Sequence, residues 1–500
     1  MDIKEQKIAE IRKGLNNIIC QIDKFASEST RLDMVESSLF KELLSLGLKL
    51  LNYYIVSVGI IVLQRGVPID NEQEKMKNTG LKKRLYRSIF GMIEIIRPKY
   101  YSKTDKVHYA LDKELGLPKG RMSYVLSNWL SYGAVDLDFR ESVGLLNQIL
   151  GQKLEGEQSS RCTYHLSEDV ENYYDSKDWT KIEDKSCLSA GFDGKGVPIL
   201  KSETQRVNES VSVRLSRGQK RQVKKEATVS VSSSFRPKKR TKEDIINSLF
   251  CVKTIDTKDK TQQLCEVKET HQWHENKHTR AFLSDKEGAI RYGIDNLLKR
   301  DSTQTKPIII LIDGDRSLRK KAEQIAEEKS ITDRISAYVL DFIHVIEYVW
   351  KVANAYKGEK NPQREEWVKK YAEKLLMGQV NEVIDDWKKV KGDGENEAGK
   401  PFSINQLHNI NRGITYFENH TDMMRYDEYL EHGYPITTGA IESACGHFVK
   451  SRMERNAMHW SIKGAQKMLN IRAVKKNDDW QEYQKAFIDK EQIKLYKLAS

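Results

Sequence analysis

The stretch KPIIILIDGD (306–315) decides the fold of this chain. Its five central residues, 308–312, are all large and aliphatic, and an apolar run this short is typical of a buried strand. The run ends at Asp313 and Gly314, a pair that favours a turn. We therefore expect a central strand here, in a sheet with helices packed on it.

Elements of both kinds flank this strand. Periodicity predicts helices over 285–300 and 318–328 and a further strand within 334–344. Three short β-branched runs further upstream predict an antiparallel meander. They cover 188–200, 209–218 and 224–235, and the polar stretch 251–284 is interpreted as a connection. A meander followed by alternating helices and strands predicts an α+β protein with a mixed sheet, and the ribonuclease H-like fold has this order of elements.

Helical periodicity covers most of the chain outside this sheet. Around Gly151, one amphipathic helix follows another, which is the outline of a helix-turn-helix DNA-binding motif and equally of an ordinary helical hairpin. A long charged helical region separates the last predicted strand from the C-terminal helices, as an insertion would. The expected organisation is a helical N-terminal region at 1–95, a helix-turn-helix-like region at 96–180, the first part of the sheet domain at 188–342, a helical insertion at 343–432 and a C-terminal part of the sheet domain at 433–500.

Composition limits the class of protein. The 500 residues carry 84 Lys and Arg against 72 Asp and Glu, a net charge of +12, and the mean hydropathy is −0.64. These values argue against an integral membrane protein, and the basic balance favours a polyanionic partner such as nucleic acid. The apolar run 50–63 is short for a membrane span, so we expect a buried helix there. The six cysteines form no CxxC pair, which argues against a disulfide framework or structural zinc and fits a reducing cytoplasm.

Three acidic residues lie in apolar surroundings on predicted elements. Asp193 is inside the first strand of the meander, Asp313 ends the central strand, and Glu442 comes early in a late helix. A carboxylate in such a place is costly unless it is paired or bound to a cation. Three of them can hold two Mg²⁺ or Mn²⁺ ions for phosphodiester chemistry. The alternatives are turn residues at Asp193 and Asp313, a helix-dipole partner at Glu442, and Asp315 as the second ligand in place of Asp313.

Several other residues have both a functional and a structural interpretation. His344 follows the last predicted strand and is either an active-site contact or a hydrogen-bonded core histidine. Arg452 is a candidate phosphate contact, and Trp460 either stacks on a base or belongs to the core. The basic residues that could contact DNA, or that could simply be solvated, are Arg217, Lys220, Lys224, Lys225, Lys450 and Arg455.

Together these motifs resemble the bacterial insertion-sequence transposases of the ISKra type, and more distantly the Mutator-like superfamily. The resemblance spans roughly 85 to 480. The segments that carry it are the Asp-Gly at 193–194, the strand that ends at 313–314, LDFIH (340–344), GAIESAC (439–445) with KSRM (450–453), MHWS (458–461), GA (464–465), IRA (471–473), and the basic residues of 217–227. LDKELGL (111–117) follows a segment in which many relatives have a cysteine pair, and this chain has none there, so we expect no zinc.

The resemblance implies a ribonuclease H-like catalytic domain with a helical insertion before Glu442. By matching position it implies that Asp193, Asp313 and Glu442 bind metal and catalyse DNA cleavage at element ends, followed by joining of the 3′-OH to target DNA. We expect terminal inverted repeats and target DNA as partners, at least a dimer on DNA, no membrane, and a location at the bacterial nucleoid in the cytoplasm. The alternatives are a DNA-binding regulator or domesticated protein without the chemistry, and a ribonuclease H-like nuclease without strand transfer.

Overall fold

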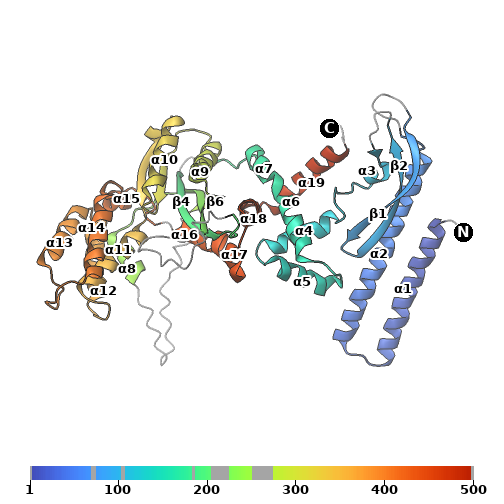
Figure 1. The fold of residues 1–500 in the computed structure, drawn as a ribbon, viewed down its shortest axis with the longest axis horizontal. Helices are drawn as coiled ribbons and strands as arrows, with labels where there is room; N and C mark the ends of the chain where they lie inside the picture. Colours follow the sequence, from blue (N-terminus) through green and yellow to red (C-terminus); the bar gives the residue numbers. More distant parts are fainter. Residues whose placement is uncertain are drawn as a thin grey trace. The chain divides into compact units, whose positions relative to one another are not determined.

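The computed structural model describes residues 3–68, 75–102, 107–182, 186–203, 224–250, 274–437 and 439–496. The chain forms two compact units, one from residues 1–175 together with 478–500 and the other from 176–477. Figure 1 shows that each unit combines helices with one sheet, so the predicted mixture of helices and strands is confirmed.

The first unit contains a long helical hairpin and a small antiparallel sheet. Helices α1 (Ile3–Ser27) and α2 (Leu32–Gln64) form the hairpin, and the sheet has the strand order β1-β2-β3. The remaining elements of this unit are β1 (Lys77–Ser88), β2 (Gly91–Tyr101), β3 (Val107–His108), α3 (Ala110–Glu114), α4 (Tyr124–Ala134), α5 (Phe139–Leu150), α6 (Gly156–Leu166), α7 (Val170–Ser176) and α19 (Trp480–Tyr496). The expected boundary at residue 95 falls inside β2, because the basic segment forms an antiparallel hairpin of β1 and β2.

Helix α2 corrects the expectation of a buried apolar helix. It is more than twice as long as the apolar run 50–63, and its buried side chains are Ile55 and Val62, which pack against Ile93 and Ile95 of β2. Within the described residues, α2 alone has the length and composition to cross a membrane. Its most apolar 18-residue window has a mean hydropathy of 1.9 and is 11% buried. A single helix of this kind is weak evidence for a membrane span, because helices of soluble proteins meet the same criteria.

The predicted helix pair around Gly151 is confirmed. Helix α5 begins with a capping box. The Asp138 side chain accepts hydrogen bonds from the backbone amides of Arg140 and Glu141, and the Glu141 side chain accepts one from the Asp138 amide. It ends at Gly151, whose φ of 62° is the left-handed conformation that glycine adopts readily. Helices α4, α5 and the following segment share one apolar core, made of Leu126, Leu130, Val143, Leu146, Leu150 and Leu154.

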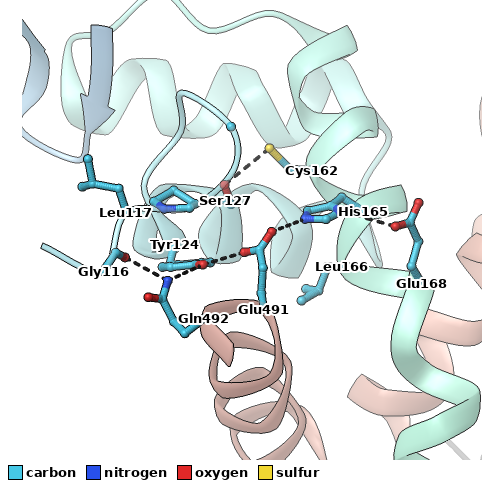
Figure 2. Close-up of polar contacts among 12 residues, drawn as sticks. Gly116, Leu117, Tyr124, Ser127, Cys162, His165, Leu166, Glu168, Glu491 and Gln492 are labelled. Atoms are coloured by element: carbon cyan, nitrogen blue, oxygen red, sulfur yellow. Dashed lines mark hydrogen bonds and ion pairs between the residues drawn. The ribbon is translucent and has the colours of Figure 1, made fainter. Parts of the chain in front are cut away.

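The C-terminal helix α19 packs in the first unit through a buried carboxylate (Figure 2). The Tyr124 hydroxyl donates to Glu491 over 2.5 Å, and His165 Nε2 lies 2.9 Å from the same carboxylate. The neighbouring Gln492 donates to the Gly116 carbonyl over 3.0 Å and to the Tyr124 hydroxyl over 2.8 Å. These bonds explain why a helix that we expected in the sheet domain belongs to the first unit.

The second unit is built on a five-stranded mixed sheet. Its strand order is β6-β5-β4-β7-β8, with antiparallel pairing among β4, β5 and β6 and parallel pairing among β4, β7 and β8. The strands are β4 (Cys187–Pro198), β5 (Lys224–Phe235), β6 (Glu275–Leu283), β7 (Ile308–Ile312) and β8 (Ile335–Leu340). The strand expected at 209–218 lies outside the described residues.

Strand β6 corrects the interpretation of 251–284 as a connection. Its residues His278, Thr279 and Arg280 are polar, which hid the strand, yet all three are buried. They are accommodated because each finds a partner. His278 Nε2 lies 2.8 Å from the Tyr292 hydroxyl, and the Thr279 amide donates to the side chain of Asn477 over 2.9 Å.

Helices cover both faces of this sheet. One face carries Leu188, Ala190 and Phe192 of β4, which pack in one core with alternate residues of β7 and with α9 and α10. The opposite face is covered in part by α16, which contacts β4 and β5. The helices of this unit are α8 (Lys242–Phe250), α9 (Lys286–Arg300), α10 (Arg316–Glu328), α11 (Phe342–Tyr356), α12 (Arg364–Leu376), α13 (Val380–Asp393), α14 (Ile404–Glu418), α15 (Tyr426–Glu431), α16 (Gly439–Ala444), a π-helix (Cys445–Lys450), α17 (Ser451–Met453) and α18 (Ile462–Lys476).

Candidate active site

The register of two parallel strands brings Asp193 and Asp313 together. Strand β4 pairs with β7 up to Phe192 opposite Ile312, so the two aspartates occupy the next matching positions. Phe192 and Ile312 point into the core formed with α9 and α10. Because side chains alternate along a strand, Asp193 and Asp313 belong to the opposite face. The two residues thus lie side by side on one face of the sheet, as the sequence predicts.

Helix α16 packs on this same face. A Cβ atom at Gly191 would lie 1.8 Å from Cδ1 of Ile441, so glycine is what allows this helix to approach β4 so closely. Glu442 is the next residue of the helix, and its backbone therefore lies close to the strand that carries Asp193. The side chain of Glu442 lies outside what the structure describes.

Ionisation of both Asp193 and Asp313 is electrostatically unfavourable. Burial raises the pKa of Asp313 to about 6, and the charge of Asp193 adds to this rise. The amide of Asp315, which donates to Asp313 Oδ1 over 3.1 Å, and the imidazole of His344 work in the opposite direction. A cation placed between the two carboxylates would relieve this repulsion.

Cys445 is a neighbour of the pair that sequence reasoning missed. Its buried thiol is hydrogen-bonded to Asp193, and burial together with the charges of Asp193 and Asp313 raises its pKa. The thiol is therefore a neutral donor to the carboxylate. It begins the π-helix that continues α16, and π-helical turns are frequent at functional sites.

Asp341 and His344 form a second polar pair beside the aspartates. Asp341 is fully buried and caps α11 by accepting a hydrogen bond from the Ile343 amide. Its other carboxylate oxygen lies 2.9 Å from His344 Nδ1. This hydrogen bond raises the pKa of His344 to about 9, and Asp313 contributes to the rise. His344 is therefore a cation at neutral pH, and part of its ring is exposed.

The structure distinguishes Asp313 from its rival Asp315. Asp315 caps α10 by accepting from the Ser317 amide over 2.8 Å, and its other oxygen is paired with Lys286. Both oxygens of Asp315 thus have hydrogen-bond donors, whereas among the described contacts the carboxylate of Asp313 has one, the amide of Asp315. Of the two residues, Asp313 therefore has the carboxylate with fewer described partners.

Helix α14 of the expected insertion holds the loop that carries Asp313. The Tyr416 hydroxyl donates to the Asp313 carbonyl oxygen over 3.1 Å, and His420 Nε2 lies 3.0 Å from the Gly314 carbonyl oxygen. Gly314 has a φ of +95°, and a Cβ atom there would lie 2.3 Å from the Tyr416 hydroxyl. The ring of Tyr348 stacks on Tyr416 with centroids 3.9 Å apart. No pattern in the sequence marks Tyr416 or His420 for this role.

Two residues of the C-terminal segment that the sequence offers as possible DNA contacts are not accessible at the surface. Arg452 and Trp460 are both buried, with the guanidinium 4.9 Å from the centre of the indole. Trp460 donates to the Met453 carbonyl, and its backbone forms a parallel bridge with Ile199 at the end of β4. The packing favours the core interpretation of Trp460, and Arg452 is buried beside it rather than solvated.

The basic residues divide into three groups. Lys224 is paired with Glu454 over 2.5 Å, and Lys225 follows it along β5. Lys450 is exposed at the end of the π-helix, and Arg455 is half-buried. Arg217 and Lys220 lie outside the described residues.

The donor set fits a hard cation as far as the structure describes it. Among the described side chains, no group of three or more His, Cys, Asp or Glu residues is arranged to hold a metal ion. Asp193 and Asp313 nevertheless supply carboxylate oxygens, which Mg²⁺ and Mn²⁺ prefer, at a place where their negative charge is only partly compensated. The third expected donor is the side chain of Glu442, which the described part does not include.

Comparisons with known proteins add no family to this picture. No family profile matches the chain, and no curated protein is significantly similar to it.

Proposed function

We propose that this protein is a DNA transposase of the Asp-Asp-Glu type, related to the ISKra-type insertion-sequence enzymes. In this proposal it hydrolyses phosphodiester bonds at the ends of a mobile element and joins the freed 3′-OH to target DNA. The observation that carries the proposal is the pairing of Asp193 and Asp313 on adjacent parallel strands, with α16, the helix whose sequence includes Glu442, packed on the same face.

The topology of the sheet supports a ribonuclease H-like catalytic domain. Three antiparallel strands are followed by two parallel strands on the other side of β4, and helices lie between the later strands. The two aspartates come from the first and fourth strands of this sheet in chain order, and α16 follows the helices α11–α15. The match in element order, rather than any single residue, is what makes this architecture the preferred one.

Each polar residue then has a distinct task. Asp193, Asp313 and Glu442 would hold the metal ions, which when bound supply activation of the attacking oxygen and stabilisation of the leaving oxygen. The cationic His344 would contact an oxygen of the scissile phosphate from the side of Asp341. The Cys445 thiol orients the Asp193 carboxylate by donating to it.

The first unit is the proposed DNA reader. Helices α5 and α6 follow each other across Gly151, as the two helices of a helix-turn-helix do, and the net charge of the chain favours duplex DNA. Inverted repeats at the element ends and target DNA are the proposed partners, in the bacterial cytoplasm at the nucleoid. Two ends must be held together for joining, so at least a dimer is proposed on DNA.

Purified full-length protein incubated with labelled DNA from the borders of its own gene tests this function. In Mg²⁺ or Mn²⁺ we expect nicks that leave 3′-OH ends, and joining of these ends to a target plasmid. Asp313→Asn should abolish both products. Asp315→Asn is the matched control, because it makes the same change two residues away and keeps the helix cap.

The other outcomes point to the alternatives. Metal-dependent cutting without joining would favour a ribonuclease H-like nuclease, and tight binding of the border DNA without cutting in either metal would favour a regulator or domesticated protein. Equal loss of activity in Asp313→Asn and Asp315→Asn would contradict the assignment of Asp313.

A further inference from the structure

The α1–α2 hairpin uses two of its sides inside its own unit. The two helices meet where Gly14 and Ile18 are buried and where Gln21 donates to Ser38 over 2.9 Å. On a second side, Ile55 and Val62 of α2 pack on the small sheet and α3. A third side of the hairpin takes part in neither of these two contacts.

That third side is apolar. On α2, large side chains recur at heptad spacing over more than five turns, and on α1 a shorter set recurs at spacings of four and three. We call this set the hairpin stripe: Leu15, Ile19 and Ile22 of α1 with Phe40, Leu43, Leu50, Tyr54 and Ile61 of α2, each between 41% and 56% exposed.

Helical geometry places both halves of the stripe on one side of the hairpin. Leu15 and Ile22 follow Gly14 and Gln21, which face α2, by one residue and are therefore rotated to the same side of that contact line. In α2, Leu43 and Leu50 are rotated in the same sense away from the residues that face α1. Because the two helices run antiparallel, this rotation brings them to the same side of the hairpin as Leu15 and Ile22. The stripe therefore lies on one side of the hairpin and includes both helices, and it is interrupted on α2 at Gly47, where a Cβ atom would lie 2.6 Å from the ring of Phe90.

A lipid bilayer is a poor occupant for this surface. Helix α1 lies along α2 and carries eight charged side chains, spread from Lys4 to Lys24. Insertion of α2 into a membrane would draw these charges in or separate the hairpin, and charged groups are costly in the hydrocarbon core. Heptad spacing instead favours packing against other helices.

We propose that the hairpin stripe pairs with the same stripe of a second copy of this chain, which forms a four-helix bundle. A two-fold axis lets identical patches meet, and the antiparallel hairpin offers helices running in both directions for that pairing. Eight side chains about half exposed supply on the order of 700 Å² of surface, against about 800 Å² per partner in a standard interface. This inference is independent of the chemistry proposed above.

Light scattering of the full-length protein during gel filtration tests the proposal. The wild type should have twice the 57.9 kDa mass of the chain, and Leu43→Glu with Leu50→Glu should have the mass of one chain. The matched control is Leu81→Glu with Ile96→Glu, which adds the same charges at exposed apolar positions of β1 and β2 and should remain a dimer.

Several results would overturn this assignment. One is a wild type that is monomeric at 100 µM protein (about 10⁻⁴ M, far above the Kd of a stable dimer). Another is a dimeric wild type for which the two double variants have the same mass. Flotation with vesicles of three parts phosphatidylcholine and one part phosphatidylglycerol, lost in the Leu43→Glu and Leu50→Glu variant, would assign the stripe to a membrane. Circular dichroism checks folding, and if the glutamate variant unfolds, Leu43→Ala with Leu50→Ala should weaken the dimer at least tenfold.

Discussion

Two carboxylates, the buried Glu491 of the first unit and the half-buried Asp313 of the second, have opposite pKa shifts. Burial of Glu491 works to raise its pKa, but the hydrogen bonds from His165 and Tyr124 outweigh burial and lower it (Figure 2). Burial of Asp313 also raises its pKa, and here the neighbour is a second carboxylate, Asp193, so that the pKa reaches about 6. The charge of Glu491 is compensated by its own protein, whereas that of Asp313 is compensated only in part, by the Asp315 amide and His344.

This difference separates a structural acid from a functional one. A carboxylate that receives two donors ties helices together and needs nothing else. Two carboxylates held side by side cost stability unless a bound cation compensates them, and such arrangements are concentrated at functional sites. Asp193 lies on β4 and Asp313 directly follows the fully buried β7, and the unfavourable proximity of the two is why we propose the chemistry there.

The largest expected effect is the loss of cleavage on removing either member of the aspartate pair. Asp193→Asn and Asp313→Asn should each lower the cleavage rate at least about a thousandfold, because the metal ligands act as a unit. Gel-shift assays should show affinity for border DNA within about twofold of wild type. A parallel loss of DNA binding in both variants would mean that these residues stabilise the fold instead.

Glu491 should show the reverse pattern. Glu491→Ala leaves His165 and the Tyr124 hydroxyl without their acceptor, and we expect a loss of about 2–3 kcal/mol of stability with cleavage almost unchanged. Thermal unfolding followed by fluorescence measures the first, and the border-DNA assay measures the second. Asp489→Ala is the control, since it removes an exposed acid from the same helix.

The sequence predicted the acidic pair well because its signals are local. Both aspartates follow or interrupt apolar strands, and the parallel register that joins β4 to β7 follows from the order of elements. The partners of the pair were not predictable in this way. Cys445 and Tyr416 reach the site through tertiary packing from distant helices, and no periodicity records such contacts.

The same reason explains the errors in the fold. Strand β6 was hidden because its polar residues are buried only after Tyr292 and Asn477 supply partners from elsewhere. Helix α2 was expected to be buried because hydropathy reports apolar character and not what covers it. The last helix was assigned to the wrong unit because Glu491 finds its donors more than 300 residues away in the chain.

A third prediction concerns how Asp313 is held rather than whether it is present. Tyr416→Phe removes the hydroxyl that donates to the Asp313 carbonyl oxygen, and we expect cleavage to slow about tenfold through misplacement of the loop. Affinity for border DNA and the melting temperature should change little. Tyr348→Phe is the matched control, because it removes the same group from the ring stacked on Tyr416.

His420 provides a second variant for the same idea. His420→Ala removes the ring that lies against the Gly314 carbonyl oxygen, so cleavage should fall again while DNA binding persists. If Tyr348→Phe slows cleavage as much as Tyr416→Phe, the effect is not specific to the hydrogen bond between the Tyr416 hydroxyl and the Asp313 carbonyl oxygen, and this role of Tyr416 is contradicted.

The smallest expected effect is a difference in how pH changes stability. The ordinary pKa of Asp313 is 3.8 and its folded value is about 6, so the unfolded chain loses this proton first and stability falls as pH rises between these values. Asp313→Asn should therefore melt about 2–4 °C above wild type at pH 8 without metal, and equal to it near pH 4. For Glu491 the folded pKa lies below 4.5, so its contribution is present above pH 4.5 and is lost as the solution becomes more acidic.

Addition of Mg²⁺ at pH 8 should raise the melting temperature of wild type and leave that of Asp313→Asn unchanged, because the ion supplies the compensating charge that the aspartate pair lacks. Equal shifts in both proteins would place the ion elsewhere and remove the electrostatic argument for this site.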